Sequence, residues 1–363
     1  MTLEDLRLRL SEVDRKLVEL IAQRQRIVAD IGAHKIEHAV PTRDYEREKE
    51  VLKGARAQAS ELGLDPKLAE EVMRLLIRSS LTQQEQTRVA AHASGAGKRV
   101  LVIGGAGKMG AWFAEFLASQ GYAIEIADPA ADAALPYPRI ADWRDSPLDH
   151  DIIIVATPIK IAASVLEELA DRRPRGLVMD IGSLKTPLRS ALGRLAAAGC
   201  RVTSIHPMFG PDTRLLSGRH VIFVDLGHAE ATAEARSLFA PTMAEQIEMS
   251  LEDHDRLIAF VLGLSHALNL VFFTALANSG ELVPRLQKLS STTFDAQLKV
   301  AALVARDNPH LYFDIQTLNE YGGTALAALN DAAATISRLV ESKDEAGFVA
   351  LMEAGRRYLE NRG

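Results

Sequence analysis

Six short β-rich runs alternate with helical segments over residues 99–250, and this alternation constrains the fold more than any other feature of the sequence. The runs are RVLVI, AIEIA, DIIIVATP, GLVMDIGS, RVTSI and HVIFVDL. Strands that alternate with helices favour a parallel sheet with helices on both of its faces. We therefore predict a doubly wound α/β domain over residues 99–250.

A glycine-rich segment follows the first of these runs directly. Gly105, Gly107 and Gly110 form a GxGxxG pattern between RVLVI and the predicted helix AWFAEFLAS. Glycines at this spacing permit a tight turn, let a pyrophosphate approach the backbone and allow close packing of helix on strand. The helix N-terminus then supplies N–H groups for the phosphates. The alternative is a glycine turn without a ligand, but the strand-to-helix position favours a Rossmann-type dinucleotide site that includes Lys108 and Met109.

The second run ends at Asp128, about twenty residues after the glycines, as the dinucleotide pattern requires. A carboxylate at this position accepts hydrogen bonds from the ribose hydroxyls and repels a 2′-phosphate. The sequence therefore predicts NAD rather than NADP as the cofactor.

The segments on either side of the α/β domain contain no convincing strand. Pro41 ends a first long helix, a second begins near Asp44, and Asp65-Pro66 opens a third, so we predict a helical domain over residues 1–91. HASGAGK predicts a flexible linker over residues 92–98. Residues 251–363 are too apolar for a monomeric bundle, which predicts an all-helical, dimer-forming C-terminal domain.

Composition narrows the class of protein. The 363 residues predict two or three domains, and the formal net charge of −6 gives no reason to expect a nucleic acid or membrane partner. Cys200 is the only cysteine, which excludes a disulfide framework and a thiolate metal cluster, and we predict no metal. The run IAFVLGLSHALNLVFFTALA carries Ser, His and Asn, so we expect a buried helix there rather than a membrane span. We expect a cytoplasmic enzyme.

Charged residues interrupt an apolar seam in the first helix. The seam recurs at spacings of three and four through Leu3, Leu6, Leu10, Val13, Leu17, Leu20, Arg24, Ile27 and Ile31. Lys35 lies eleven residues after Arg24, on the same face. A solvated charged face, or ion pairs within one helix, would explain Asp44, Arg47 and Glu48 of the second helix. Neither would explain a cation inside the seam, because burying an unpaired cation is costly. Arg24 in the seam therefore favours an internal pocket for an anion.

Over residues 3–88 the sequence resembles the all-helical chorismate mutases. The resemblance includes Leu6-Arg7, His34-Lys35, the run PTRDYERE that begins at Pro41, and SSLTQQ that begins at Ser79. It implies a substrate pocket lined by Arg7, Arg24, Lys35, Asp44, Arg47, Glu48, Ser79 and Gln83. The implied roles are carboxylate binding by the arginines, contact of Lys35 and Gln83 with the ether oxygen, and placement of Asp44 and Glu48 near the ring hydroxyl.

This chemistry needs no acid, base or nucleophile. Chorismate rearranges to prephenate in a pericyclic step, which is helped by holding the dianion in a compact conformer and by stabilising charge on the ether oxygen. Arg7 and Arg24 are seventeen residues apart, or about 25 Å along a straight helix, so one chain does not bring both to one pocket. The resemblance implies that Arg7 comes from a partner subunit in an intertwined homodimer.

A second constellation lies in the α/β domain and beyond it. Ser204-Ile-His206-Pro-Met-Phe-Gly-Pro-Asp212 follows a strand at the carboxyl edge of the predicted sheet. A lone histidine there is more often structural. Together with Asp180-Ile-Gly-Ser183-Leu-Lys185, Thr157-Pro158 and Leu264-Ser265-His266, however, it makes residues 99–315 resemble the prephenate dehydrogenases.

The resemblance implies a role for each of these residues. His206 in its neutral form takes the proton of the prephenate hydroxyl while hydride passes to NAD⁺ and CO₂ leaves. Ser183 orients His206 or the substrate, Lys185 supports that loop, and Thr157 and Pro158 lie at the cofactor. His266 lies near the substrate side chain, although a structural role in the helical core is equally compatible with the pattern. The mutase-first order matches bifunctional enzymes that make 4-hydroxyphenylpyruvate for tyrosine.

One position departs from the family. Where the prephenate dehydrogenases place an arginine for the ring carboxylate, this sequence has Asp295. Lys299, one turn later, is positioned to take over that role. Two alternatives follow from the departure: the same two steps on 4-amino-4-deoxychorismate and 4-amino-4-deoxyprephenate, or a non-catalytic NAD-binding regulatory protein. The intact His206 and Ser183 count against the second alternative.

Overall fold

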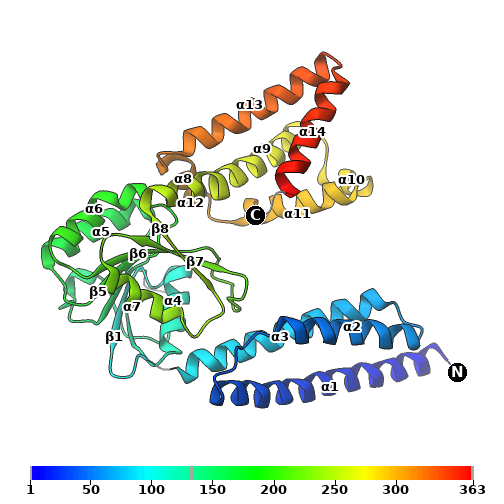
Figure 1. The fold of residues 1–363 in the computed structure, drawn as a ribbon, viewed down its shortest axis with the longest axis horizontal. Helices are drawn as coiled ribbons and strands as arrows, with labels where there is room; N and C mark the ends of the chain where they lie inside the picture. Colours follow the sequence, from blue (N-terminus) through cyan, green and yellow to red (C-terminus); the bar gives the residue numbers. More distant parts are fainter. Residues whose placement is uncertain (1, 93, 131–134, 361–363) are drawn as a thin grey trace. The chain divides into compact units, whose positions relative to one another are not determined.

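The computed structural model, drawn in Figure 1, describes residues 2–92, 94–130 and 135–360. The chain divides into two compact units. The first unit consists of residues 1–157, 168–181 and 194–248, and the second of residues 158–167, 182–193 and 249–363, as far as these are described. Residue 93 of the predicted linker and the predicted domain ends 1 and 361–363 lie outside the described residues. The predicted boundaries after residues 91, 98 and 250 stay predictions.

The N-terminal region is helical, with its breaks where the sequence predicts them. It consists of α1 (Leu3–Glu37), α2 (Tyr45–Glu61) and α3 (Pro66–Ala91). Side chains that satisfy free backbone N–H groups fix the helix starts. Thr2 and Asp5 form a reciprocal capping box on α1, and the carboxylates of Asp44 and Asp65 cap α2 and α3.

The apolar seam of α1 is only partly covered within the chain. Near its C-terminal end α1 packs closely against α3. The approach is close enough that a Cβ on Gly32 would lie 3.2 Å from Cγ of Gln84. Towards the N-terminus the seam is open: Leu10 is 61% exposed and Leu17 54%. A long helix with an uncovered apolar stripe requires a further packing partner.

The α/β region forms one eight-stranded sheet in the order β3-β2-β1-β4-β5-β6-β7-β8. The strands are β1 (Arg99–Ile103), β2 (Ala123–Ala127), β3 (Arg139–Ile140), β4 (Ile152–Val155), β5 (Leu177–Asp180), β6 (Val202–Pro207), β7 (His220–Asp225) and β8 (Glu245–Ser250). Strands β1 to β6 pair in parallel, which confirms the doubly wound sheet. β7 departs from the prediction and runs antiparallel to β6, because a loop without a crossover helix joins them.

Helices alternate with the strands along the chain. They are α4 (Lys108–Ala118), α5 (Ile159–Arg172), α6 (Arg189–Ala197) and α7 (Ala229–Phe239), with the short 3₁₀ turns η1 (Trp143–Asp145) and η2 (Thr186–Leu188). Phe113 and Leu117 of α4 and Phe239 of α7 are fully buried against the strands. Residues 94–97 of the predicted linker form a turn, and the Gly95 N–H donates to the Gln120 carbonyl at 3.1 Å.

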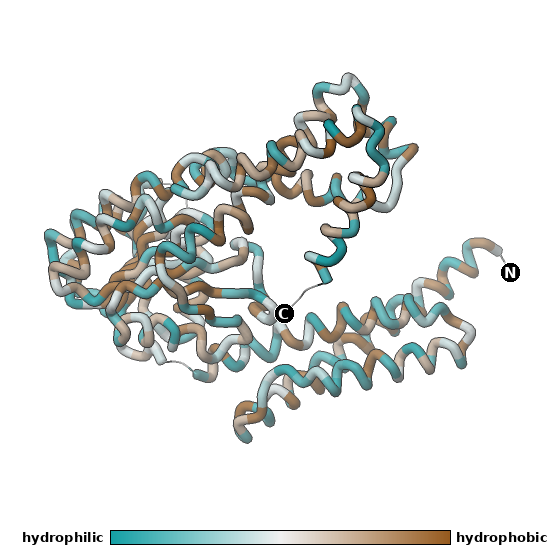
Figure 2. The backbone as a smooth tube through the Cα atoms, turned by 45° about the horizontal axis from the view of Figure 1, so that its top comes forward, coloured by the Kyte–Doolittle hydropathy of each residue, from teal (hydrophilic) through white to brown (hydrophobic). Residues whose placement is uncertain are grey.

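The C-terminal region is all-helical, as predicted. It consists of α8 (Leu251–Ile258), the π-helical η3 (Ala259–Leu264), α9 (Ser265–Asn278), α10 (Val283–Lys288), α11 (Thr292–Arg306), α12 (Pro309–Leu318), α13 (Gly322–Glu341) and α14 (Glu345–Glu360). Hydrophobic residues recur along these helices (Figure 2), and Phe260, Leu268 and Val271 are exposed in the single chain.

The most apolar helical stretch is therefore not the buried helix that the sequence predicts. Only 28% of its most apolar window is buried in the single chain. Among the described residues Leu251–Asn278 alone is long and apolar enough to cross a membrane, and length and composition by themselves are weak evidence for a span. An apolar helix face left open in one subunit equally fits an interface between subunits.

Candidate active sites

A pocket of about 510 Å³ lies among α1, α2 and α3. Its walls are apolar, with Ile27, Met73 and Leu81 among them. Five of the predicted substrate residues line it, together with two neighbours of predicted ones: Arg24, Lys35, Asp44, Arg47, Glu48, Ser80 and Gln84. The helices thus bring together polar groups that the sequence spreads over sixty residues.

Two cations of the pocket are held by neutral oxygen atoms. Arg24 donates to the Leu76 carbonyl at 3.1 Å and to the Ser80 hydroxyl at 2.5 Å. The Lys35 ammonium donates to the Thr42 carbonyl at 2.7 Å. Burial lowers the pKa of Arg24, but an arginine remains charged near neutral pH. Cations that have no carboxylate among these partners keep their charge available for an anionic ligand.

The acidic residues of the pocket lie at the start of α2. Asp44 accepts the Arg47 N–H at 3.0 Å as the helix cap. The two oxygens of Glu48 accept hydrogen bonds from Nε and Nη2 of Arg43, at 2.8 and 3.1 Å. Arg47 is largely exposed and bonds Glu50 at 3.0 Å. Residue type alone did not single out Arg43, whose partner lies five positions further along the chain.

The predicted residues on α3 are wrong by one position. Ser80 and Gln84 are buried and line the pocket. Ser79 is instead exposed and accepts a hydrogen bond from Gln25 at 2.7 Å, and Gln83 does not line the pocket. One residue on an α-helix is a rotation of about 100°, enough to leave the face. The apolar series Met73, Ile77 and Leu81 marks the correct face in the sequence.

Arg7 does not reach this pocket within the chain. It is exposed on the same helix as Arg24, near the opposite end. The prediction that a partner subunit supplies Arg7 therefore remains open.

The glycine loop after β1 has the close approaches that the sequence predicts. A Cβ on Gly110 would lie 2.3 Å from the Gly104 carbonyl oxygen, and one on Gly105 would lie 2.5 Å from Ile126. Gly104 adopts a φ of +83°, which also requires glycine. Gly107 caps α4, which begins at Lys108 with Met109 in its first turn. The backbone N–H groups at this helix start form a cradle for an anion.

Two further groups at the same sheet edge fit a dinucleotide. The Asp128 carboxylate accepts the N–H of Ala106, within the glycine loop, at 3.0 Å and the N–H of Ala130 at 2.9 Å. The predicted ribose acceptor therefore lies directly beside the loop. Thr157 Oγ1 is buried, and no hydrogen-bond partner for it occurs in the described part of the chain. A buried hydroxyl without a partner is a natural contact for a ligand.

His206 lies on β6 and is 4% exposed. The parallel pairing of β1, β4, β5 and β6 brings it to the same carboxyl edge as the glycine loop. Ser183, Lys185 and Pro158 belong to the second unit, and their predicted positions beside His206 and the cofactor stay predictions.

Within the second unit a buried carboxylate holds the loop that carries Ser183 and Lys185. Asp255 accepts the N–H groups of Lys185 and Thr186 and shares a 2.6 Å hydrogen bond with His254. Although burial acts to raise its pKa, these hydrogen bonds keep the pKa of Asp255 below the ordinary value. The sequence did not indicate Asp255, because it lies 70 residues from the loop it organises.

Of the three predicted substrate residues on the C-terminal helices, His266 packs on an aromatic ring, whereas Asp295 and Lys299 are exposed. His266 stacks on Tyr312 with ring centroids 4.1 Å apart, burial lowers its pKa, and its Nδ1 finds no partner among the described residues. Asp295 is exposed in the first turn of α11 and accepts the Ser290 hydroxyl at 2.5 Å. Lys299 is exposed on the same helix.

A second pocket, also of about 510 Å³, is lined by α3, α4 and the loop after β6. Trp112 and Phe116 form its aromatic wall, with Glu115 and Arg214 beside them. None of the predicted site residues lines it, so its size does not make it an active site.

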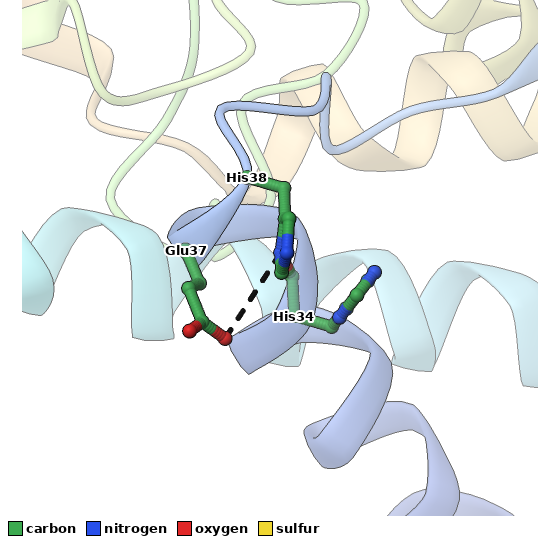
Figure 3. Close-up of side chains that lie close together, drawn as sticks. All are labelled: His34, Glu37 and His38. Carbon is green, nitrogen blue, oxygen red and sulfur yellow. Dashed lines mark hydrogen bonds and ion pairs between the residues drawn. The ribbon is translucent and has the colours of Figure 1, made fainter.

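His34, Glu37 and His38 gather where α1 ends (Figure 3). Their ligand atoms lie within 4.8 Å of one another, the spacing of a metal site, but all three are exposed. His38 Nδ1 also bonds the His34 carbonyl at 2.9 Å. The arrangement equally fits histidines that cap free carbonyls at a helix end.

Comparison with known protein families divides the chain into three matches. Residues 6–85 match the type II chorismate mutase model, residues 127–248 the nucleotide-binding domain of prephenate dehydrogenase, and residues 250–354 its dimerization domain. The three matches fall, in this order, in the predicted N-terminal helical, α/β and C-terminal helical segments.

Relatives match over most of the chain. The T-protein of Enterobacter agglomerans is 27% identical over 348 residues, covering 95% of this chain and 90% of that protein. The T-protein of Haemophilus influenzae is 26% identical over 355 residues, covering 96% and 89%. The 4-amino-4-deoxyprephenate dehydrogenase of Streptomyces pristinaespiralis is 30% identical over 275 residues, covering 73% of this chain and 92% of that protein.

Solved structures share the fold. The prephenate dehydrogenase from A. aeolicus, in complex with hydroxyphenyl propionate and NAD⁺, aligns with a TM-score of 0.57 at 20% identity and covers 74% of this chain and 99% of that one. The Synechocystis arogenate dehydrogenase aligns with a TM-score of 0.56 at 19% identity, covering 73% and 100%.

Proposed function

This chain belongs to the prephenate dehydrogenase family and carries a type II chorismate mutase domain at its N-terminal end, and we propose that it catalyses both reactions in succession. It converts chorismate to prephenate and then prephenate to 4-hydroxyphenylpyruvate with NAD, in the synthesis of tyrosine. The observation that carries the proposal is the presence, on one chain, of a helical pocket in which Arg24 and Lys35 are held by neutral oxygens, and of a glycine cradle at the sheet edge that bears His206.

The mutase step rests on binding alone. Arg24 and Lys35 hold the dianionic substrate folded, since both present donors that bind carboxylate and ether oxygens. Ser80 fixes the Arg24 guanidinium, and Gln84 takes the place beside the ether oxygen that the sequence assigned to Gln83. Asp44 and Glu48 lie towards the ring hydroxyl. Apolar walls strengthen these contacts by excluding water.

The dehydrogenase step needs a base beside a hydride acceptor. NAD⁺ bound on the glycine cradle supplies that acceptor, with Asp128 at its ribose. His206, in its neutral form, accepts the hydrogen bond of the substrate hydroxyl and takes the proton as the carbonyl forms. Ser183 orients the imidazole or the substrate, and Lys185 supports the loop that Asp255 holds. His266, whose Nδ1 has no hydrogen-bond partner in the described part of the chain, faces the substrate side chain.

The amino-substituted substrates are not favoured over chorismate and prephenate. The two T-proteins match nearly the whole chain, mutase region included, whereas the Streptomyces relative covers 73% of it. The Asp295 carboxylate has a structural use, because an acid in the first turn of a helix is stabilised by the helix dipole. In this proposal Lys299 binds the ring carboxylate of the substrate in place of the family's arginine.

The enzyme acts as a homodimer, which fits the match to a dimerization domain. The finer arrangement that we propose is a mutase pocket completed by Arg7 of a second copy. The open seam of α1 supports it, because exposed leucines along that helix would be covered by another copy of the same helix. We propose a cytoplasmic location, as expected of an enzyme whose substrates and cofactor are water-soluble small molecules.

The purified protein with chorismate and NAD⁺ tests the proposal. We expect NADH to appear, followed at 340 nm, together with CO₂ and 4-hydroxyphenylpyruvate. Turnover of 4-amino-4-deoxychorismate in preference to chorismate would transfer the function to the amino series. Absence of NADH from chorismate and from supplied prephenate would overturn the proposal.

A further inference from the structure

The loop that follows the strand of His206 makes hydrogen bonds with α3 and with the segment that joins α1 to α2. This β6–β7 loop comprises residues 208–219, between β6 and β7 in the same compact unit as α1–α3. The Leu216 N–H donates to the Glu85 carboxylate of α3 at 2.7 Å. The Ser217 hydroxyl accepts a hydrogen bond from Arg43 at 2.6 Å.

The first of these bonds is a firm anchor. Glu85 is 3% exposed, and its second oxygen accepts the Met243 N–H at 2.6 Å. Two backbone donors thus compensate one buried carboxylate. Because Glu85 adjoins Gln84 on α3, the anchor fixes a pocket-lining helix against the loop.

The second bond leads directly to the pocket. Arg43 uses Nη1 for Ser217, and its Nε and Nη2 for the two oxygens of Glu48. Glu48 lines the mutase pocket and is 20% exposed there. The three side chains therefore form one chain of hydrogen bonds, Ser217–Arg43–Glu48, from the β6–β7 loop to the substrate cavity.

The negative charge of Glu48 explains why the hydrogen bonds Ser217–Arg43–Glu48 matter for substrate binding. A pocket that binds a dicarboxylate is weakened by a negative charge on its own wall, because like charges repel in a poorly solvated site. The bidentate pair with Arg43 neutralises Glu48 and fixes the direction of its remaining lone pairs. Ser217 holds the guanidinium from the opposite side.

We propose that Arg43 is a positioning residue of the mutase site, set in place by Ser217, so that a residue of the dehydrogenase sequence tunes substrate binding in the mutase. The inference rests on the mutase function proposed above. The reciprocal consequence is that binding in the mutase pocket and the arrangement of the β6–β7 loop are thermodynamically linked.

A double-mutant cycle tests it on the full-length protein. Chorismate disappearance gives the mutase kcat and KM for wild type, Arg43→Ala, Ser217→Ala and the double variant. Since the lost neutralisation affects ground and transition states alike, KM should rise by roughly tenfold in Arg43→Ala and about threefold in Ser217→Ala, with little change in kcat. In the double variant Ser217→Ala should add nothing, because its partner is already gone.

Two further variants separate positioning from general structural damage. Glu48→Gln in the Arg43→Ala background removes the uncompensated charge and should bring KM back towards the wild-type value. Ser237→Ala, which removes an exposed hydroxyl bonded only to the Glu234 carbonyl among its described contacts, should leave KM unchanged. Turnover of supplied prephenate checks that every variant is folded.

Three outcomes overturn the inference: an unchanged KM in Arg43→Ala, a Ser217→Ala effect that is equal in both backgrounds, or no rescue by Glu48→Gln. Failure of the underlying function looks different. In that case the wild type itself does not turn over chorismate, or Arg24→Ala turns it over at the wild-type rate.

Discussion

At the scale of single residues, the mutase pocket depends on cations whose N–H groups are hydrogen-bonded to neutral oxygens, so that their positive charge is not neutralised. The Arg24 guanidinium is held by a carbonyl and a hydroxyl, and Lys35 by a carbonyl. Neutral acceptors orient a cation and leave its charge available to a ligand. Glu48, in contrast, is paired with Arg43, so its charge does not oppose the substrate.

The neighbouring serines on α3 give a matched test of this pocket. Ser80→Ala removes the acceptor that orients Arg24, and we expect the mutase kcat/KM to fall by about tenfold, the cost of a lost hydrogen bond to a charged group. Ser79→Ala removes an exposed hydroxyl outside the pocket and should change kcat/KM by less than about twofold. The reverse order of the two effects would restore the register that the sequence suggested.

Residue types identified most of this site, and the failures have physical causes. Arg24 was recognisable because a cation interrupts an apolar seam, and Asp44 because it precedes a helix. Ser79 and Gln83 were misplaced because neighbouring serines and glutamines satisfy the same local pattern, and only the packed face distinguishes them. Arg43 and Asp255 were missed because their roles depend on partners that the fold brings close.

At the scale of elements, the junction of β1 and α4 shows how a strand and a helix build a cofactor cradle. Gly110 lets the first turn of α4 lie against the loop backbone, where any side chain would meet the Gly104 carbonyl. The helix axis then points its free N–H groups at one place.

Gly110→Ala tests this element. A Cβ only 2.3 Å from a carbonyl oxygen must push α4 away from β1, so NAD affinity should fall by at least about tenfold, measured by calorimetric titration. Gly193→Ala is the control, because nothing lies within 4 Å of the added Cβ on α6 and NAD affinity should not change. Wild-type affinity in Gly110→Ala would show that the cofactor does not use this cradle.

The sequence predicted the elements where periodicity is strong. The three mutase helices and six strands were found because capping residues and β-rich runs mark them. β3, with two residues, is too short to show a pattern, and β8 is a polar edge strand of sequence EQIEMS. The antiparallel course of β7 is nevertheless indicated by the sequence, because no helical segment separates RVTSI from HVIFVDL.

At the scale of the whole molecule, the exposed apolar surface makes a single chain incomplete. Leucines line the open face of α1, and the C-terminal helices expose further aliphatic and aromatic side chains. Surfaces of this kind are covered in a dimer. Periodicity identified the seam of α1, and the apolar composition of residues 251–363 indicated the second surface, but neither shows which contacts occur between chains.

Mixing two inactive variants tests whether a mutase site is shared between copies. Arg7→Ala and Arg24→Ala should each lose most mutase activity. Co-refolded together, they form mixed dimers with one intact site of two, so about a quarter of wild-type activity should return. Arg24→Ala mixed with Lys35→Ala should recover none, because both residues belong to the same site. Recovery in both mixtures, or in neither, would contradict the shared arrangement.

The most direct test of two separate active sites is NADH formation from chorismate by a pair of variants. His206→Asn should convert chorismate to prephenate and stop there, so that prephenate accumulates without NADH. Arg24→Ala should form no NADH from chorismate but should form it at nearly the wild-type rate once prephenate is supplied. Loss of both activities in either soluble, folded variant, or NADH from chorismate in both, would contradict the account.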